Sequence, residues 1–304
     1  MISFVEGNLF ESPAQVLVNT VNTVGAMGKG IAKEFRRIYP EMFKKYQDLC
    51  ESGKLGIGDL FLHKTENKWI VNFPTKEHWK NPSKIEYLQI GLEKFSREYS
   101  RMGIHSIAFP PLGAGNGELD FESIVRPVML RYLSDLPIQI FIYPNRTDPY
   151  APEHLTPKEI KSWLRSEPKS LSFIEVWEDV KRIVASRSTF KTLSRGARFQ
   201  ALIEPESKKL VIITSSKRMA VEYDYLLKFW QQIRNNGFSI HKFAPREIYE
   251  SIWYLIPIFS ELDYVKLARY KEIVQDSEQA IFSTGLQYWP VGIKESNQQS
   301  LFPV

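Results

Sequence analysis

Short apolar runs alternate with amphipathic segments along the first half of the chain. The runs at residues 2–5, 16–19, 60–63, 69–73, 106–109 and 138–143 are rich in β-branched and aromatic side chains, which is typical of strands. Between them, Ile85, Leu88, Leu92, Phe95 and Tyr99 recur at helical spacing and predict an amphipathic helix. This alternation indicates an α/β fold, in which helices cover both faces of a mixed sheet.

The ends of that helix are marked by two sequence signals. Ser83 and Glu86 have the spacing of a capping box, in which the Ser83 hydroxyl caps the first turn. Gly103 follows the last apolar position and favours the left-handed conformation that ends many helices. We therefore expect the helix to begin at Ser83 and to end at Gly103.

A proline-rich segment separates the first half from a region of different texture. Its prolines are Pro144, Pro149, Pro152, Pro157 and Pro168, and one short helix is predicted from Thr156 onward. The remainder predicts a helix at 173–186, a hairpin of 198–204 with 210–215, a helix at 219–235 before Gly237, a strand at 239–243 and further helix, with the apolar run 252–259 in the core. We expect a first domain at residues 1–152, a linker at 153–169 and a second, smaller α+β domain at 170–304.

Composition narrows the class of protein. Of the 304 residues, 43% are hydrophobic and 25% are charged, which excludes wholesale disorder. The net charge of +5 permits a nucleotide or nucleic-acid partner without requiring one. Because Cys50 is the single cysteine, and because we find neither a signal peptide nor a bilayer-length apolar run, we expect a cytoplasmic protein without membrane contact. The histidines have no metal-ligand spacing with Cys50, so we expect no metal and no cofactor.

Two glycine-rich segments each follow a predicted strand. The first contains Gly25-Ala26-Met27-Gly28-Lys29-Gly30, and the second contains Gly113-Ala114-Gly115-Asn116-Gly117. Glycine lets backbone N–H groups approach a phosphate closely, and the start of a following helix adds partial positive charge. We expect the two loops to face each other around a pyrophosphate. Neither loop has the spacing of a P-loop or of the dinucleotide fingerprint, which disfavours a kinase or a dehydrogenase.

The motifs of the first 150 or so residues together resemble the macrodomain family. They are Gly7-Asn8-Leu9-Phe10, Asn19-Thr20-Val21-Asn22, Asn72-Phe73-Pro74-Thr75-Lys76-Glu77-His78-Trp79-Lys80 and Pro111-Leu112-Gly113-Ala114-Gly115-Asn116-Gly117. More narrowly, the segment is similar to the macrodomains of DarG-type antitoxins, which are related to the terminal ADP-ribose glycohydrolase branch. The resemblance implies a hydrolase that removes ADP-ribose from DNA bases (thymidine) modified by a DarT-like toxin. Two alternatives stay open, namely a reader that binds ADP-ribose without cleavage and an enzyme that acts on ADP-ribosylated protein carboxylates.

The resemblance also assigns roles to residues. Asn8 and Leu9 would hold the adenine edge, Asn22 would hydrogen-bond the distal ribose, and Tyr143 would stack on adenine. ADP-ribose binding is further assigned to Thr20, Met27, Gly28, Lys29, Gly30, Ile31, Pro111, Leu112, Gly113, Ala114, Gly115, Asn116 and Gly117.

Lys80 is the catalytic residue that the resemblance implies. A neutral lysine amine near the anomeric carbon can attack it and form a Schiff-base-type adduct. Without the resemblance, Lys80 would be interpreted as a solvated surface charge. The terminal glycohydrolase branch carries an aspartate in the second loop where this chain has Gly117, which would let a DNA base approach. Asp120, three residues further on, is predicted to cap the next helix.

The second domain offers basic and aromatic residues around its predicted hairpin. The basic candidates are Arg195, Arg198, Lys208 and Lys209, and the aromatic residues near them in sequence are Phe190, Phe199, Tyr223 and Tyr225. Such a mixture predicts nucleic-acid binding through phosphate contacts and base stacking. Two alternatives remain: the charges face water, or this half holds the toxin, as the resemblance to DarG-type antitoxins implies.

Overall fold

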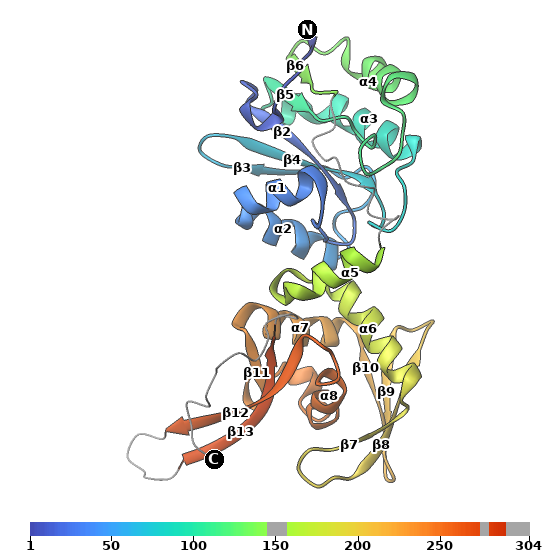
Figure 1. Ribbon diagram of the computed structural model, residues 1–304, viewed down its shortest axis with the longest axis vertical. Helices are drawn as coiled ribbons and strands as arrows, with labels where there is room; N and C mark the ends of the chain where they lie inside the picture. The colour runs from blue at the N-terminus through green and yellow to red at the C-terminus, as the bar shows by residue number, and fades with distance from the viewer. Residues whose placement is uncertain (145–156, 274–279, 290–304) are drawn as a thin grey trace. The chain divides into compact units, whose positions relative to one another are not determined.

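The computed structural model describes residues 1–144, 157–273 and 280–289. The chain forms two compact units, Met1–Lys161 and Ser162–Val304, each with its own sheet structure (Figure 1). The division falls inside helix α5 (Pro157–Ser166), the short helix that was predicted in the proline-rich segment. The boundary that we expected at residue 152 lies outside the described residues.

A six-stranded mixed sheet forms the centre of the first unit. Its strands are β1 (Ile2–Phe4), β2 (Val16–Asn22), β3 (Phe61–Lys64), β4 (Trp69–Lys76), β5 (Ser106–Phe109) and β6 (Gln139–Ile142). They lie in the order β1-β6-β5-β2-β4-β3, and all pairs are parallel except β3 with β4. The predicted mixed sheet is confirmed, although β2 and β4 continue beyond the residues where we expected them to end.

Helices cover both faces of this sheet, as predicted (Figure 1). α1 (Gly30–Ile38) and α2 (Pro40–Glu51) pack on one face, and α3 (Ile85–Met102) and α4 (Arg126–Leu133) pack on the other. Alternate residues of β2 enter the two cores, so that Leu17 packs with Phe35 of α1 and Val18 packs with Leu92 of α3. Because both faces of β2 are buried, a ligand can reach this strand only at its end.

The capping box predicted for α3 is wrong. The helix begins at Ile85, its N-cap is Lys84, and no side chain makes a capping hydrogen bond. Ser83 instead donates its backbone N–H to the Gly117 carbonyl at 3.0 Å, while its buried hydroxyl has no hydrogen-bond partner among the described residues. The other end is confirmed, since Gly103 caps α3 in the left-handed region with φ 76°.

Replacement of Ser83 distinguishes these two roles. We expect Ser83→Ala to change the free energy of unfolding by less than about 0.5 kcal/mol, because the lost hydroxyl makes no hydrogen bond. A capping serine would lose about 1 kcal/mol instead. Asp120→Ala is the matched control, since Asp120 accepts from the Ser123 backbone N–H at 2.8 Å and should show the loss of a cap. Denaturant titrations of the variants measure the difference, and an equal loss in both would restore the capping role of Ser83.

The second unit combines helices with two antiparallel sheets. The first sheet has the order β10-β9-β8-β7, and the second has the order β11-β13-β12. The elements are α6 (Phe173–Ser186), β7 (Thr189–Lys191), β8 (Arg198–Glu204), β9 (Lys209–Ile213), β10 (Arg218–Glu222), α7 (Tyr223–Asn236), β11 (Phe238–Ile240), α8 (Ile252–Phe259), β12 (Val265–Ile273) and β13 (Ala280–Tyr288). The expected α+β class is confirmed.

Two predicted elements of this unit are corrected. Residues 219–222, which we expected at the start of a helix, lie in β10, where Met219 pairs with Ile212 of β9. The strand expected at 239–243 ends at Ile240 and continues as the short 3-10 helix His241–Phe243. In both places pairing with a neighbouring strand overrides the local pattern. The strands β12 and β13 were not predicted.

A buried charged network holds the end of α5 against α6. The Asp179 carboxylate, 4% exposed, accepts hydrogen bonds from Arg165 Nε and Nη2 at 2.8 and 2.7 Å and from the Tyr264 hydroxyl at 3.0 Å. Arg182 also donates to Asp179, and Glu175 lies 3.6 Å from Arg165. Buried carboxylates require such partners, because the hydrogen bonds and ion pairs offset the hydration free energy that the charges lose on burial.

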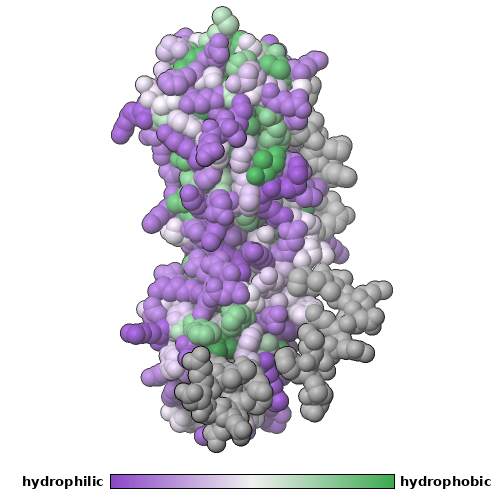
Figure 2. Space-filling view, turned by 90° about the vertical axis from the view of Figure 1, so that its left-hand side faces the viewer, coloured by the Kyte–Doolittle hydropathy of each residue, from purple (hydrophilic) through white to green (hydrophobic). Residues whose placement is uncertain are grey.

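The surface is largely hydrophilic on the face that Figure 2 shows, where apolar residues form small patches. No helix of the described ranges has the length and apolar character needed to cross a membrane. Exposed large apolar side chains include three from the second unit that lie close together in sequence, Phe243, Tyr249 and Trp253.

Candidate active site

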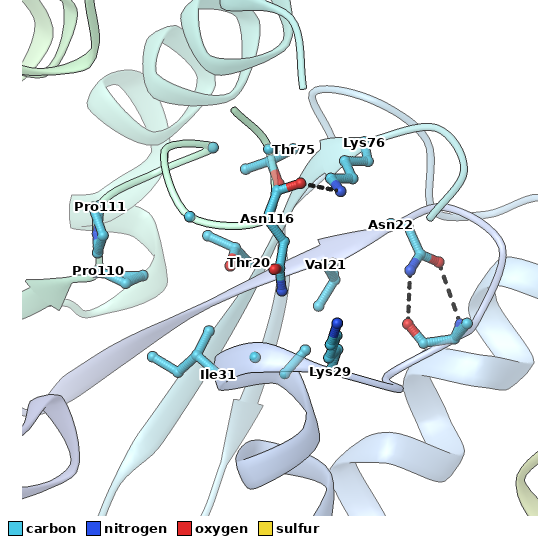
Figure 3. Close-up of a pocket in the computed structure, with 16 residues that line it drawn as sticks. Thr20, Val21, Asn22, Lys29, Ile31, Thr75, Lys76, Pro110, Pro111 and Asn116 are labelled. Carbon is cyan, nitrogen blue, oxygen red and sulfur yellow. Dashed lines mark hydrogen bonds between the residues drawn. The ribbon is translucent and has the colours of Figure 1, made fainter. Parts of the chain in front are cut away.

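A cleft opens at the carboxyl ends of β2 and β4 and beside the loop after β5 (Figure 3). Its volume is about 710 Å³ with the solvent-open mouth included. The lining residues are Thr20, Val21, Asn22, Ala26, Lys29, Gly30, Ile31, Ala32, Thr75, Lys76, Pro110, Pro111, Gly113, Gly115, Asn116 and Gly117. In the sheet, β2 lies between β5 and β4, so the connections to the later strands leave β2 in opposite directions. The cleft lies at this point, which is the usual ligand position in open α/β sheets.

The wall formed by α1 suits an anion. Lys29, Gly30, Ile31 and Ala32 line the cleft at the first turn of this helix, whose backbone N–H groups have no intrahelical acceptor. The first turn contains no acidic residue, and Gly30 has φ 58°, a conformation that an L-residue adopts only with strain. The helix dipole therefore acts with Lys29 to favour a negative ligand group here.

The second glycine-rich loop closes the opposite wall through tight packing. Leu119 N–H donates to the Gly113 carbonyl at 3.1 Å, and Ser83 N–H donates to the Gly117 carbonyl at 3.0 Å. A Cβ at Gly117 would lie 2.2 Å from the Gly113 carbonyl oxygen and 2.3 Å from Ser83 Oγ. The loop itself thus requires glycine at this position. This packing is a reason for glycine that the sequence did not indicate, and the approach of a DNA base to Gly117 stays a prediction.

Lys76 extends from the last position of β4 toward this loop. Its side chain is only 6% exposed, and Nζ donates a hydrogen bond to the Asn116 carbonyl at 2.7 Å (Figure 3). A register irregularity between Val21 and Asn22 sets Asn22 opposite Lys76 across the two strands. The cleft therefore holds a buried primary amine between its two loops.

Lys80 does not line the cleft. Its backbone N–H donates to His78 Nδ1 at 3.1 Å, and its Nζ lies 5.0 Å from the ring centroid of the buried Trp79. Lys76 belongs to the same motif as Lys80, but the resemblance did not assign it the reactive amine. The signal for Lys76 was its place at the carboxyl end of a strand, and ending that strand at Phe73 concealed it.

Asn22 is oriented by its own loop. Its Nδ2 donates to the Ala26 carbonyl at 2.7 Å, and its Oδ1 accepts from the Ala26 backbone N–H at 3.3 Å (Figure 3). The same Oδ1 accepts from the Val24 backbone N–H at 3.1 Å. The buried Tyr46 hydroxyl lies 3.1 Å from the same Oδ1 and 2.6 Å from the Asn22 carbonyl oxygen. This arrangement fixes the amide plane at the edge of the cleft. The predicted ribose contact stays a prediction, and it would have to use the second N–H of Nδ2.

The structure brings together some of the other predicted ligand residues and separates the rest. Those in the cleft are Thr20, Asn22, Lys29, Gly30, Ile31, Pro111, Gly113, Gly115, Asn116 and Gly117. Those outside the lining are Asn8, Leu9, Met27, Gly28, Leu112, Ala114 and Tyr143. Leu9, Met27 and Tyr143 are buried in the core beside α1 and α2, while Asn8 caps a short helix by accepting from Phe10 N–H at 3.1 Å. Val21, Ala26, Ala32, Thr75 and Pro110 line the cleft but were not predicted to bind.

The predicted nucleic-acid surface of the second unit is only partly formed. Arg195 and Arg198 are exposed, whereas Lys209 pairs with Glu222 at 2.7 Å. Lys208 Nζ lies 5.7 Å from the ring centroid of Tyr223. Phe190 and Phe199 are buried and contact each other with ring centroids 5.7 Å apart. Base stacking on these two rings is therefore excluded, and the phosphate contacts stay a prediction.

Cys50 lies beside Asn22 but is not suited to nucleophilic attack. Its Sγ is 3.9 Å from the Asn22 carbonyl oxygen, and burial raises the pKa of the thiol from 9.0 to about 12.

The described residues also contain no group of three or more His, Cys, Asp or Glu side chains placed to hold a metal ion.

The raised pKa predicts slow labelling of Cys50. Because the thiolate is the reactive form, the native protein should react with iodoacetamide far more slowly than the denatured chain at pH 8. The native rate should still rise steeply between pH 9 and pH 11, whereas the denatured rate should level off above about pH 10, one unit above the ordinary thiol pKa of 9.0. Mass spectrometry of labelled protein measures both rates. Equal native and denatured profiles would contradict the raised pKa.

Comparison with known proteins places the first unit in a family. Residues 18–128 match the model of the Macro domain. The chain is 41% identical to the solved macrodomain of Thermus aquaticus DarG, a match that covers 48% of this chain and 99% of that one with a TM-score of 0.46. The chain therefore belongs to the macrodomain family through its first unit, as the sequence motifs indicated.

Two curated relatives carry functional names. The DNA ADP-ribosyl glycohydrolase of Thermus aquaticus is 39% identical over 155 residues, which is 50% of this chain and 43% of that protein. The DNA ADP-ribosyl transferase-DNA ADP-ribosyl glycohydrolase fusion protein of Thermosipho africanus is 39% identical over 161 residues, which is 47% of this chain and 41% of that protein. The chain thus matches less than half the length of these relatives.

Proposed function

We propose that the first unit is an ADP-ribosyl glycohydrolase whose substrate is ADP-ribosylated DNA. The buried amine of Lys76, held 2.7 Å from the Asn116 carbonyl within an anion-binding cleft, carries this proposal. A reader would need the loops and the helix terminus but no buried amine. The glycohydrolase names of the relatives support the same activity.

Lys76 takes the nucleophilic role that the resemblance assigned to Lys80. Burial removes hydration from its ammonium, and this is the condition under which a lysine amine becomes nucleophilic. Nζ attacks the anomeric carbon of the distal ribose, the bond from that carbon to the base nitrogen breaks, and the base leaves with a proton. Water then hydrolyses the ribosyl–lysine adduct, which releases ADP-ribose and restores the amine.

The surrounding loops position the substrate for this attack. The first turn of α1 and the loop at 113–117 hold the diphosphate between them, with Lys29 adding positive charge. Asn22 fixes the distal ribose through its amide, whose orientation is set by Ala26 and Tyr46. Such positioning converts binding energy into the alignment of the anomeric carbon with Nζ.

We further propose that the modified base is thymidine and that the protein acts in the cytoplasm as the antitoxin of a DarT-like toxin. One relative joins a DNA ADP-ribosyl transferase and a glycohydrolase in a single chain, which supports a link between the two activities. On this proposal residues 1–152 bind and hydrolyse ADP-ribose, and the second unit binds DNA or the toxin.

Side-by-side incubation tests the substrate class. The full chain is mixed with an oligonucleotide that carries ADP-ribose on thymidine and, separately, with a protein ADP-ribosylated on glutamate. We expect ADP-ribose release from the oligonucleotide alone. Release from the protein alone would show that the substrate is an ADP-ribosylated protein carboxylate. Binding of both without release would identify a reader.

A further inference from the structure

The second unit presents a group of aromatic rings to solvent. The centroid of the His241 ring lies 4.5 Å from that of the Trp253 ring, with an interplanar angle of 17°. It lies 4.0 Å from the centroid of the Tyr249 ring. Trp253 is 44% exposed and Tyr249 is 46% exposed, and Phe243, two residues after His241 in the chain, is 50% exposed. We refer to His241, Phe243, Tyr249 and Trp253 as the aromatic platform.

Buried neighbours hold the backbone of the aromatic platform in place. Ala244, Ile248 and Ile252 are buried and alternate in sequence with the exposed rings. Ala244 N–H donates to the His241 carbonyl at 3.1 Å, and the Gln232 side chain donates to the Phe243 carbonyl. The rings are thus displayed by an anchored segment, which lowers the entropy lost when they bind a partner.

The rim of the aromatic platform is cationic. Lys242 and Arg246 are exposed residues of the same segment, and Lys228 and Lys217 reach it through ion pairs with Glu247 at 2.7 Å and Glu250 at 3.8 Å. Four basic side chains therefore stand against two carboxylates. The excess of positive charge favours an anionic partner.

We propose that the aromatic platform binds single-stranded DNA, with unpaired bases stacked on Trp253 and Tyr249 and phosphates beside Lys242 and Arg246. Flat aromatic faces flanked by cations are the combination that binds unpaired bases without sequence preference. A duplex would hide its base faces from these rings. This inference rests on the proposed function, which makes ADP-ribosylated DNA the substrate of the first unit.

The platform differs from the surface that the sequence suggested. Phe190 and Phe199, the aromatic residues near the predicted basic hairpin, are buried, whereas Tyr249 and Trp253 are exposed. The two locations can therefore be separated by substitution. Arg195→Gln with Arg198→Gln removes charge from the hairpin and leaves the platform intact.

Binding of fluorescein-labelled oligothymidylate of about 12 nucleotides to the full chain tests the proposal by anisotropy at low salt. We expect Trp253→Ala to weaken binding by at least about 5-fold and Trp253→Phe to restore most of it, because a ring remains for stacking. Leu267→Ala removes a similarly exposed apolar side chain, 46% exposed, and should leave the affinity unchanged. Lys242→Gln with Arg246→Gln should weaken binding and reduce its salt dependence.

Three results would overturn the proposal. The first is equal affinity of Trp253→Ala and the unchanged protein, and the second is a loss confined to the Arg195→Gln, Arg198→Gln variant. The third is a Trp253→Ala variant that binds DNA as the unchanged protein does but no longer co-purifies with a DarT-like toxin. This result would make the platform a protein-docking surface. Release of ADP-ribose from the isolated modified nucleoside is measured in parallel, so failure of the glycohydrolase activity is distinguished from failure of the platform.

Discussion

Lys76→Ala should reduce the release of ADP-ribose from modified DNA by at least about 10³-fold, while Lys80→Ala should retain nearly full activity. The difference follows from where the two side-chain amines lie. Lys76 Nζ lies in the cleft against the Asn116 carbonyl, and Lys80 Nζ lies over the Trp79 ring outside the cleft lining. Both substitutions remove one lysine from the same short segment, so each serves as the control for the other.

Affinity measurements separate a chemical role of Lys76 from a binding role. Calorimetry should show that Lys76→Ala binds ADP-ribose within a few-fold of the unchanged protein, because the amine acts on bond cleavage. Lys76→Arg keeps the positive charge but supplies no comparable nucleophile, and it should also be inactive. Full activity of Lys76→Ala would contradict the assignment. Loss of activity in Lys80→Ala alone would return the nucleophile to Lys80.

Gly117→Ala should damage the second loop and the cleft together. A Cβ at this position would lie 2.2 Å from the Gly113 carbonyl oxygen, a backbone atom that can move only with the loop. We expect the free energy of unfolding to fall by about 1–3 kcal/mol and the affinity for ADP-ribose to fall about tenfold. Thermal unfolding and calorimetry measure the two effects. Gly117→Asp, which copies the residue of the terminal glycohydrolase branch, should meet the same obstruction.

Gly115→Ala is the matched control in the same loop. A Cβ there would have no heavy atom within 4 Å, so we expect its free energy of unfolding to stay within about 0.5 kcal/mol of the unchanged protein. Gly117→Ala and Gly115→Ala with the same stability and the same affinity would show that the loop relaxes around a methyl group. The packing argument for Gly117 would then be wrong.

The sheet, its covering helices and the location of the two loops could be predicted because their signals are local. The continuous apolar run Val16-Leu17-Val18 marks β2, and a helical stripe ending before Gly103 marks α3. Loops that follow parallel strands meet at one edge of the sheet, so the cleft followed from the order of elements.

Features that depend on contacts between distant segments could not be predicted in this way. Ser83 has the spacing of a cap, yet its backbone is bound by Gly117 from the second loop. Residues 218–222 become β10 because β9 offers a partner for pairing. Lys76 enters the cleft because β4 continues to that residue beside β2, and the length of a strand depends on its neighbour as much as on its own sequence.

The charged network around Asp179 has a consequence for dividing the chain into fragments. Arg165 belongs to α5, which precedes the start at residue 170 that the sequence suggested for the second domain, yet it supplies two hydrogen bonds to a carboxylate of α6. A fragment that begins at residue 170 would lose the guanidinium that compensates Asp179 and Glu175. Any recombination that transfers the second unit to another protein should therefore carry the last turn of α5 with it.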